Sequence, residues 1–154
     1  MIKNYKQFNE SLINKLEGPN EEQIWDYLNG LKLNPNDLLI KSSESGFLPG
    51  VKKALDNGAN INYSNELALY QAVSNSFYDV VKYLIENGAN IEGENNDVLK
   101  SALLSHDVDI LKLLLDNSKH TFNVDELITL ARGLKEYQMV DMLEIYKKQN
   151  IKNG

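Results

Sequence analysis

The stretch that decides the fold is DNGANIN, residues 56–62, because the chain spells nearly the same letters again as ENGANIE at 86–92. The match extends upstream, where VKKALDNGANIN (51–62) and VKYLIENGANIE (81–92) share seven of 12 positions. A fixed period of about 20–50 residues is typical of stacked supersecondary units. The sequence therefore predicts a repeat protein with a period of 30 residues.

Weaker copies follow the two clear ones. LKLLLDNSKHTF (111–122) keeps the Lys, Leu, acid and Asn but lacks Gly-Ala, and VDMLEIYKK begins at Val140 after a step shortened by one residue. One small residue recurs upstream in each unit, at Ser42, Ala72, Ala102 and Ala131. These patterns predict a single repeat domain spanning 1–154. Its parts are an N-terminal helical cap at 1–34 and four repeats at about 35–62, 63–92, 93–122 and 123–150.

Hydrophobic spacing predicts two helices in each unit. In the second unit Leu69, Ala72 and Val73 are spaced i, i+3, i+4, and a similar stripe begins at Val80 after a polar break. Gly88 then suits the left-handed position that ends a helix. Neither helix can bury its stripe alone, so stacked neighbours must share a core, and the small residue permits close approach.

This pattern resembles the ankyrin repeat, strongly over 36–118 and more weakly over 119–148. The matching positions are Leu39, Gly46, Val51, Leu55, Gly58, Ala59, Asn60, Ile61, Leu69, Ala72, Val80, Val81, Leu84, Ile85, Gly88, Ala89, Asn90 and Ile91. The resemblance implies an all-α helix-turn-helix solenoid that binds a protein and is not an enzyme. Because the period is 30 rather than about 33 residues, the projecting β-fingers of the family are expected to be truncated.

Ser118-Lys119 stand where the family has Gly-Ala. Since a helix commonly ends on a left-handed residue, we expect Asn117 or Ser118 to adopt a positive φ, and Asn does so more readily.

The N-terminal part resembles a cap. Residues 3–16 place four apolar side chains on one helical face, and Asn20 with Gln23 resembles a capping box. Asn34-Pro35 is typical of an N-cap followed by the first helical residue. Trp25 is expected to cover the first repeat, with contact to a partner as the alternative, and Phe77 is expected to pack.

Charge excludes several partner classes. The 154 residues carry a net charge of −6, with Arg132 as the single arginine and no cysteine. Nucleic acids and anionic membranes need a basic surface, so neither is an expected partner. No stretch approaches the roughly 18 apolar residues of a membrane span. We expect a cytoplasmic protein and, as a separate expectation, a monomer.

Candidate chemistry is sparse. His106 with Asp107 and Asp109 could bind a divalent metal, but His106 also occupies the turn where the family places Gly. We favour the turn and predict no catalytic, cofactor or metal site.

The first residues, MIKNYKQFNES, resemble the capsid-targeting leader of internal head proteins of tailed phages, a resemblance that implies cleavage between Glu10 and Ser11. The competing interpretation, which we favour, is the first cap helix. Three functions remain open. The first is a virus- or phage-encoded protein that binds a host protein, the second is a structural protein packaged in the phage head, and the third is an enzyme or small-ligand binder. The expected location is the host cytoplasm or the virion.

Partner binding is expected on the concave face. Each first helix should contribute the residue before it and the two residues before its turn, with Tyr63 as an aromatic addition. The predicted residues are Asn36, Glu44, Ser45, Tyr63, Glu66, Ser74, Asn75, Asn96, Leu104 and Ser105.

Overall fold

The computed structural model describes residues 21–93, 97–119 and 122–151, and every regular element in these ranges is an α-helix. The helices are α2 (Glu21–Gly30), α3 (Pro35–Glu44), α4 (Leu48–Asp56), α5 (Tyr63–Ser74), α6 (Tyr78–Glu86), α7 (Asp97–Leu104), α8 (Val108–Asn117), α9 (Val124–Leu134) and α10 (Tyr137–Ile151). The helix predicted at 3–16, Asn20 of the capping box and the Glu10–Ser11 bond lie outside the described residues.

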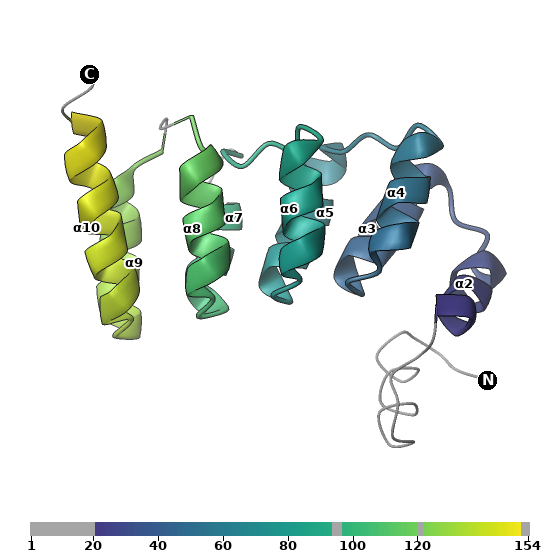
Figure 1. The fold of residues 1–154 in the computed structure, drawn as a ribbon, viewed down its shortest axis with the longest axis horizontal. Helices are drawn as coiled ribbons and strands as arrows, with labels where there is room; N and C mark the ends of the chain where they lie inside the picture. Colours follow the sequence, from purple (N-terminus) through teal and green to yellow (C-terminus); the bar gives the residue numbers. More distant parts are fainter. Residues whose placement is uncertain (1–20, 94–96, 120–121, 152–154) are drawn as a thin grey trace, which may run out of the picture.

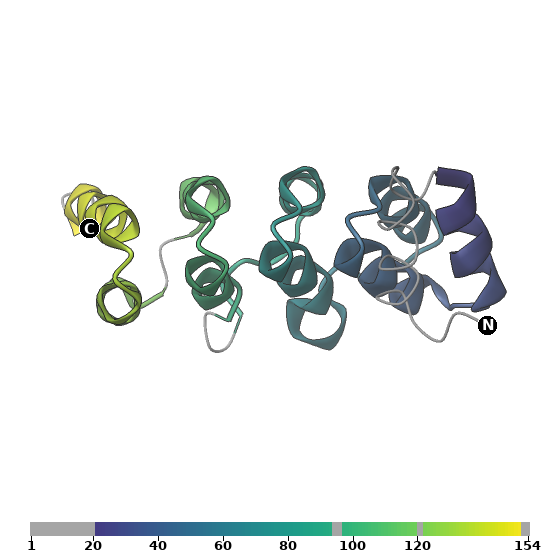
Figure 2. The same ribbon diagram turned by 90° about the horizontal axis from the view of Figure 1, so that it is seen from below.

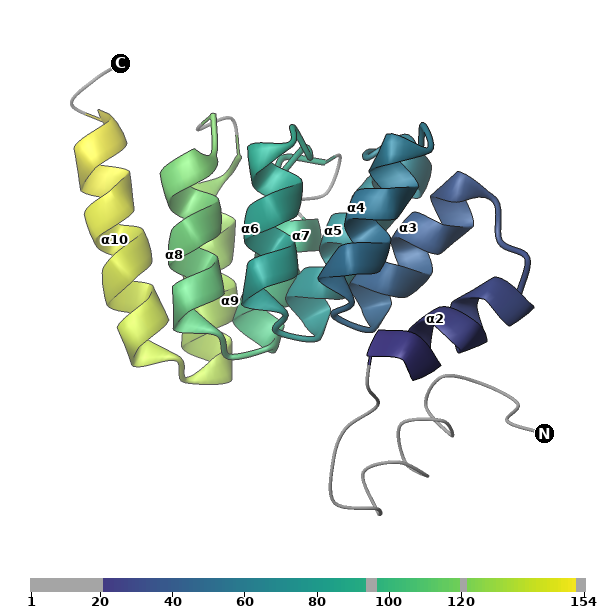
Figure 3. The ribbon, with the colours of Figure 1, turned by 45° about the vertical axis from the view of Figure 1, so that its right-hand side comes forward.

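The helices stack as consecutive pairs (Figure 1). The first helices α3, α5, α7 and α9 contact one another in chain order, and so do the second helices α4, α6, α8 and α10. Viewed along the helices, they form two rows (Figure 2). Helix α2 lies at an angle across the α3–α4 end of the stack (Figure 3). The predicted all-α repeat solenoid is therefore confirmed.

The repeating small residue lets the first helices approach closely. Ser42, Ala72, Ala102 and Ala131 are all completely buried. Around them lie the predicted stripes, including Leu69, which is also fully buried. Because each buried Leu or Val contributes about 1.5–3 kcal/mol, the shared core between neighbouring pairs supplies most of the stability of the stack.

A left-handed residue ends the first helix of every pair. These residues are Gly46 (φ 69°), Ser76 (58°), His106 (58°) and Lys135 (64°). The next backbone N–H then reaches back to the carbonyl of the small residue, as from Phe77 to Ala72 at 2.9 Å. Such bonds satisfy carbonyls at the helix end, so the turn is held by backbone geometry even where glycine is missing.

The second helices of the first two pairs end as predicted. Gly58 and Gly88 have φ values of 85° and 90°. Asn34 caps α3, accepting a 3.0 Å hydrogen bond from the N–H of Asp37, with Pro35 directly after it. The connector at 57–62 contains no strand, so the β-finger is truncated as predicted.

The expectation of a positive φ at Asn117 or Ser118 is wrong. Asn117 is the last residue of α8, and Ser118 is extended, with φ −78° and ψ 155°. The Ser118 hydroxyl donates to the carbonyl of Leu115 at 3.1 Å and lies 2.6 Å from the hydroxyl of Tyr146. These side-chain contacts end the helix without the left-handed residue.

Trp25 covers the first repeat, as predicted. Its ring meets the buried ring of Phe47 edge-on, with centroids 4.9 Å apart, and Lys53 Nζ lies 4.5 Å from its centroid. Phe77 packs as expected, because its ring lies so close to Gly46 that a Cβ there would stand 2.5 Å from it.

Candidate functional site

Side-chain oxygens accept hydrogen bonds from the backbone of successive connectors, in a series that we call the connector ladder. Asn36 Oδ1 accepts from the backbone N–H of Asn60 at 2.8 Å, and Asn62 Oδ1 accepts from that of Asn90 at 2.8 Å. The Glu92 carboxylate then accepts from the N–H of Lys119. The ladder fixes one edge of the stack, so side chains along it are held by a rigid backbone.

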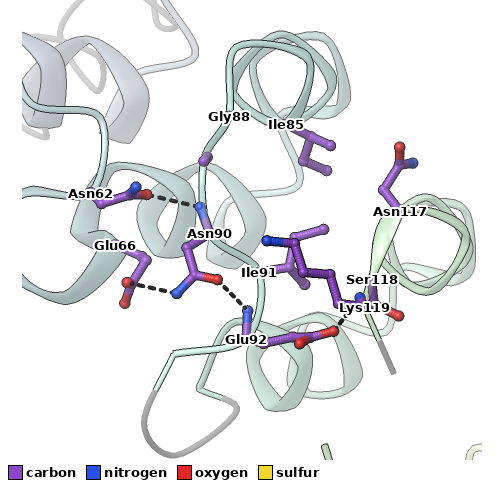
Figure 4. A pocket seen from close by; sticks show the side chains of 11 residues that line it. Asn62, Glu66, Ile85, Gly88, Asn90, Ile91, Glu92, Asn117, Ser118 and Lys119 are labelled. Atoms are coloured by element: carbon purple, nitrogen blue, oxygen red, sulfur yellow. Dashed lines mark hydrogen bonds between the residues drawn. The ribbon is translucent and has the colours of Figure 1, made fainter. Parts of the chain in front are cut away.

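A hollow that we call the connector notch lies between the second and third connectors (Figure 4). Its volume is about 480 Å³. Apolar groups from Ile85 and Ile91 line it beside polar side chains. The residues around it are Asn62, Glu66, Ile85, Gly88, Ala89, Asn90, Ile91, Glu92, Asn117, Ser118 and Lys119. The notch lies where the connector that keeps Gly-Ala faces the connector that has lost it.

A second hollow, which we call the helix groove, lies between α5 and α7 and has a volume of about 210 Å³. It is lined by Asn65, Glu66, Leu67, Tyr70, Gly93, Asp97 and Val98. A wider hollow of about 640 Å³ follows between α7 and α9. The first-helix layer is therefore hollowed at two successive junctions.

Glu66 lines both the connector notch and the helix groove. It ends a left-handed turn, in which Ser64, Asn65 and Glu66 have φ values of 56°, 54° and 56°. Its Oε1 accepts from Asn90 Nδ2 at 3.1 Å. A Cβ on Gly93 would stand 2.7 Å from its Oε2, so glycine at this position leaves room for the carboxylate.

Two of the predicted partner-binding residues present large apolar side chains to solvent. Leu104 is 58% exposed at the end of α7, and Tyr63 is 44% exposed at the start of α5. Exposed apolar side chains mark a binding surface when they form a contiguous patch. Asn96 lies outside the described residues.

The other predicted residues have partners within the chain. Asn36 is in the connector ladder, and Asn75 Nδ2 donates to the carbonyl of Gln71 at 2.8 Å. Ser74 Oγ lies 2.7 Å from Ser101 Oγ, which joins α5 to α7.

Three further predicted residues are bonded within their own helix ends. Glu44 pairs with Lys41 at 2.7 Å. The Ser45 and Ser105 hydroxyls donate to backbone carbonyls of their own helix ends. Placing Asn36 before its helix was wrong, because it lies within α3. Glu66 does precede the right-handed part of α5, because its own φ is 56°.

Sequence reasoning missed Tyr70, which is 37% exposed and lines the helix groove. It also missed Lys100, 30 residues later, whose Nζ lies 2.7 Å from a carboxylate oxygen of Glu126. A usable signal was present, because Tyr70 adjoins the buried Leu69 but falls outside the apolar stripe. An aromatic residue outside the stripe predicts a surface contact.

His106 has a structural place in the turn after α7. It takes the left-handed position that was favoured for it, and its Nδ1 lies 2.6 Å from Glu136 Oε1 at the next turn. Asp107 caps α8 by accepting from the N–H of Ile110 at 3.0 Å, and Asp109 is in the first turn of α8. In the described part of the chain no three His, Asp or Glu side chains are grouped to hold a metal. His120 lies outside that part.

No helix among the described residues is long and apolar enough to cross a bilayer.

Comparison with known proteins gives one family. A family model described as ankyrin repeats (3 copies) matches residues 10–95 and, in an overlapping match, 38–126. These matches cover more than half of the chain and confirm the resemblance that the two Gly-Ala-Asn-Ile signatures carry. Proteins with such repeats are generally protein–protein interaction modules and are typically not enzymes. No curated protein and no solved structure gives a significant match.

Proposed function

Because the chain belongs to the ankyrin repeat family, we propose that it binds a partner protein and catalyses no reaction. The binding surface in this proposal is the face formed by the connectors and the first helices, which we call the front face. The observation that carries the proposal is Glu66, whose carboxylate lines two adjoining hollows on this face. The exposed side chains of Tyr63, Tyr70 and Leu104 lie on the same helices.

Rigidity of the front face supports the proposal. Tyr70 and Leu104 extend from regular helices, and the connector ladder holds the loops between them. Side chains that are already positioned lose less conformational entropy when a partner binds. Tyrosine is enriched among the residues that carry most of the binding energy at interfaces, so Tyr63 and Tyr70 are the proposed anchors.

The second helices, which we call the back layer, offer the competing surface. A hollow of about 480 Å³ lies between α6 and α8, and one of about 420 Å³ lies between α8 and α10. Tyr78 and Ile145 line these hollows and are exposed. A partner on the back layer is therefore the alternative that an experiment must separate from the front face.

Affinity capture from cell lysate would identify a partner, and calorimetry with that partner would locate its site. We expect the double variant Tyr70→Ala, Leu104→Ala to weaken binding at least about tenfold, or roughly 1.4 kcal/mol. Both residues are exposed, so thermal unfolding should change little. The matched control is Tyr78→Ala, Ile145→Ala on the back layer. If the control variant abolishes binding and the front-face variant does not, the proposed face is wrong.

The sequence alone also supports a more specific proposal about the origin of this chain and of its partner. A virus- or phage-encoded protein acting on a host would capture a host protein and would act in the host cytoplasm as a monomer. A packaged head protein would instead be found in purified virions, cleaved between Glu10 and Ser11. Mass spectrometry of virions and of the captured partner separates the two hypotheses.

A further inference from the structure

The helix groove combines an apolar wall with two carboxylates and an aromatic ring. Leu67 and Val98 supply apolar surface, and Glu66 and Asp97 supply the carboxylates. Tyr70 stands at the same groove with part of its ring open to solvent. These are the components that surround a long cationic side chain, which has an apolar stem and a charged end.

The charges of the groove are not balanced within the described part of the chain. None of the ion pairs formed there involves Glu66 or Asp97. Glu66 accepts a hydrogen bond from the neutral amide of Asn90, which positions its carboxylate without cancelling its charge. Lys100, one turn after Asp97 on α7, pairs with Glu126 of α9 at the next junction.

Glycine at position 93 adds an observation that concerns space and not charge. A Cβ at Gly93 would come within 2.7 Å of Glu66 Oε2, although nothing lies within 4 Å of the Cβ position at Gly58 or Gly88. A Cβ at this position would displace the flexible end of Glu66, so the position of the carboxylate in the groove goes with glycine at 93. A hollow of about 210 Å³ remains, which can admit one side chain but not a bulky ligand.

We propose that the helix groove receives an arginine or lysine side chain from a basic segment of the partner, an inference that rests on the proposed function. The stem of that side chain lies against Leu67 and Val98. Its cationic end lies between the carboxylates and the face of Tyr70, where a cation–π contact adds to the attraction. The net charge of −6 favours encounter with a basic partner.

Nuclear magnetic resonance with a defined probe tests the groove directly. The full chain, labelled with nitrogen-15, is titrated with N-acetyl-L-arginine amide at low ionic strength. We expect saturable shifts confined to the residues around the groove, such as Tyr70, Gly93 and Val98, with a dissociation constant in the millimolar range. The matched probe is N-acetyl-L-citrulline amide, which has nearly the same shape but no charge and should give no such shifts.

Variants then test the carboxylates. Glu66→Gln with Asp97→Asn keeps the shapes and removes both charges, and it should weaken arginine amide binding at least about tenfold, or roughly 1.4 kcal/mol. The control Asp116→Asn with Asp141→Asn removes two exposed charges from the back layer and should leave binding unchanged. Equal shifts with citrulline amide, or equal loss in both double variants, would overturn the proposal.

The experiments distinguish failure of the groove inference from failure of the proposed function. If the arginine probe does not bind but Tyr70→Ala, Leu104→Ala still weakens partner binding, the groove inference fails and the front face stands. If the probe binds in the groove but the front-face variant has no effect on the partner, the front-face proposal fails. If the partner's binding segment has no basic residue, the inference also fails.

Discussion

Gly88 and Ser118 lie 30 residues apart at equivalent positions after α6 and α8, and the two helices end by different chemistry. After α6 the left-handed Gly88 turns the chain, and the N–H of Ala89 returns to the carbonyl of Leu84 at 3.0 Å. After α8 the chain leaves extended at Ser118, whose hydroxyl contacts that of Tyr146 on α10. The end of α6 is therefore held by a backbone hydrogen bond, whereas the end of α8 is held by a side chain from the next repeat.

The difference shows how a stack of repeats can remain folded when one connector lacks the Gly-Ala pair. Tyr146 is nearly buried and also stacks on Phe122, with centroids 5.6 Å apart and planes 17° from parallel. This contact joins the third connector to the last helix, so one aromatic residue does what the Gly-Ala pair does elsewhere. We therefore expect the third connector to depend strongly on one side chain, while the second depends on several small contributions.

The largest expected effect comes from Tyr146→Ala, which removes the stack and the hydroxyl contact together. Truncating a buried aromatic residue costs about 3–5 kcal/mol, and urea unfolding would measure it. Tyr137→Ala on the same helix is the control, because Tyr137 is 69% exposed and should cost less than about 0.5 kcal/mol. If the two variants lose similar amounts of unfolding free energy, the third connector does not depend on Tyr146 as proposed.

A smaller effect is expected from Tyr146→Phe, which keeps the ring and removes the hydroxyl. Loss of that hydrogen bond should cost about 0.5–1.5 kcal/mol at neutral pH. Ser118 still donates to Leu115, so its hydroxyl keeps a partner. Urea unfolding at pH 7 measures this difference, and a variant as stable as the parent chain would mean that the hydroxyl contact contributes nothing.

The free energies of unfolding of the parent chain and of Tyr146→Phe should depend differently on pH in alkali. Burial raises the pKa of the Tyr146 hydroxyl above 10.0; the hydrogen bond with Ser118 lowers it, and the carboxylates of Glu92 and Asp116 raise it. Because the folded pKa is raised, the neutral hydroxyl stabilises the fold fully below about pH 10, and this contribution is lost as pH rises through the folded pKa. The stability advantage of the parent chain over Tyr146→Phe should therefore shrink as the pH rises above about 10, and a constant difference would contradict the assignment.

Gly88→Ala should cost about 1 kcal/mol, because an alanine at a φ of 90° is strained. Gly133→Ala is the matched control, since Gly133 lies in α9 with no positive φ and nothing within 4 Å of its Cβ position. That change should stabilise the protein by up to about 1 kcal/mol. If Gly88→Ala and Gly133→Ala change the unfolding temperature in the same direction, the second connector does not depend on the left-handed geometry of Gly88.

Asn90→Ala should have the smallest effect, about 0.5–1 kcal/mol. The side chain of Asn90 donates to Glu66 and accepts from the N–H of Glu92 at 3.2 Å, but it is exposed. Asn117→Ala on the third connector removes one exposed bond within a single helix end, from Nδ2 to the carbonyl of Leu113. If Asn117→Ala costs more than Asn90→Ala, the side chain of Asn90 contributes less to the second connector than expected.

Most of the fold could be predicted because its determinants are local. Apolar stripes such as Leu69, Ala72 and Val73 give the helices, and glycines at 58 and 88 give the ends of two of them. The exception was the helix end at Ser118, where the deciding partner lies 28 residues away. A pattern search over neighbouring residues cannot find that partner.

The candidate surface was predicted less well. Exposure of Tyr63 and Leu104 followed from their positions outside the stripes. Asn36 and Ser74 were expected to be available to a partner, but each has a bond 24 to 27 residues away within the chain. Tyr70 was missed because its one signal, a place outside the apolar stripe, does not show that a hollow lies beside it.

By itself the sequence determined the repeat, the helix pairs, the shared core and the family. These follow from the spacing of apolar, small and glycine residues, which acts through backbone geometry over a few residues. Only the tertiary structure decided that Tyr146 completes the third connector and that Glu66 lies between two hollows. Both depend on where side chains of different repeats meet, and the physical reason is that stacking fixes their rotamers and distances only after the local elements have formed.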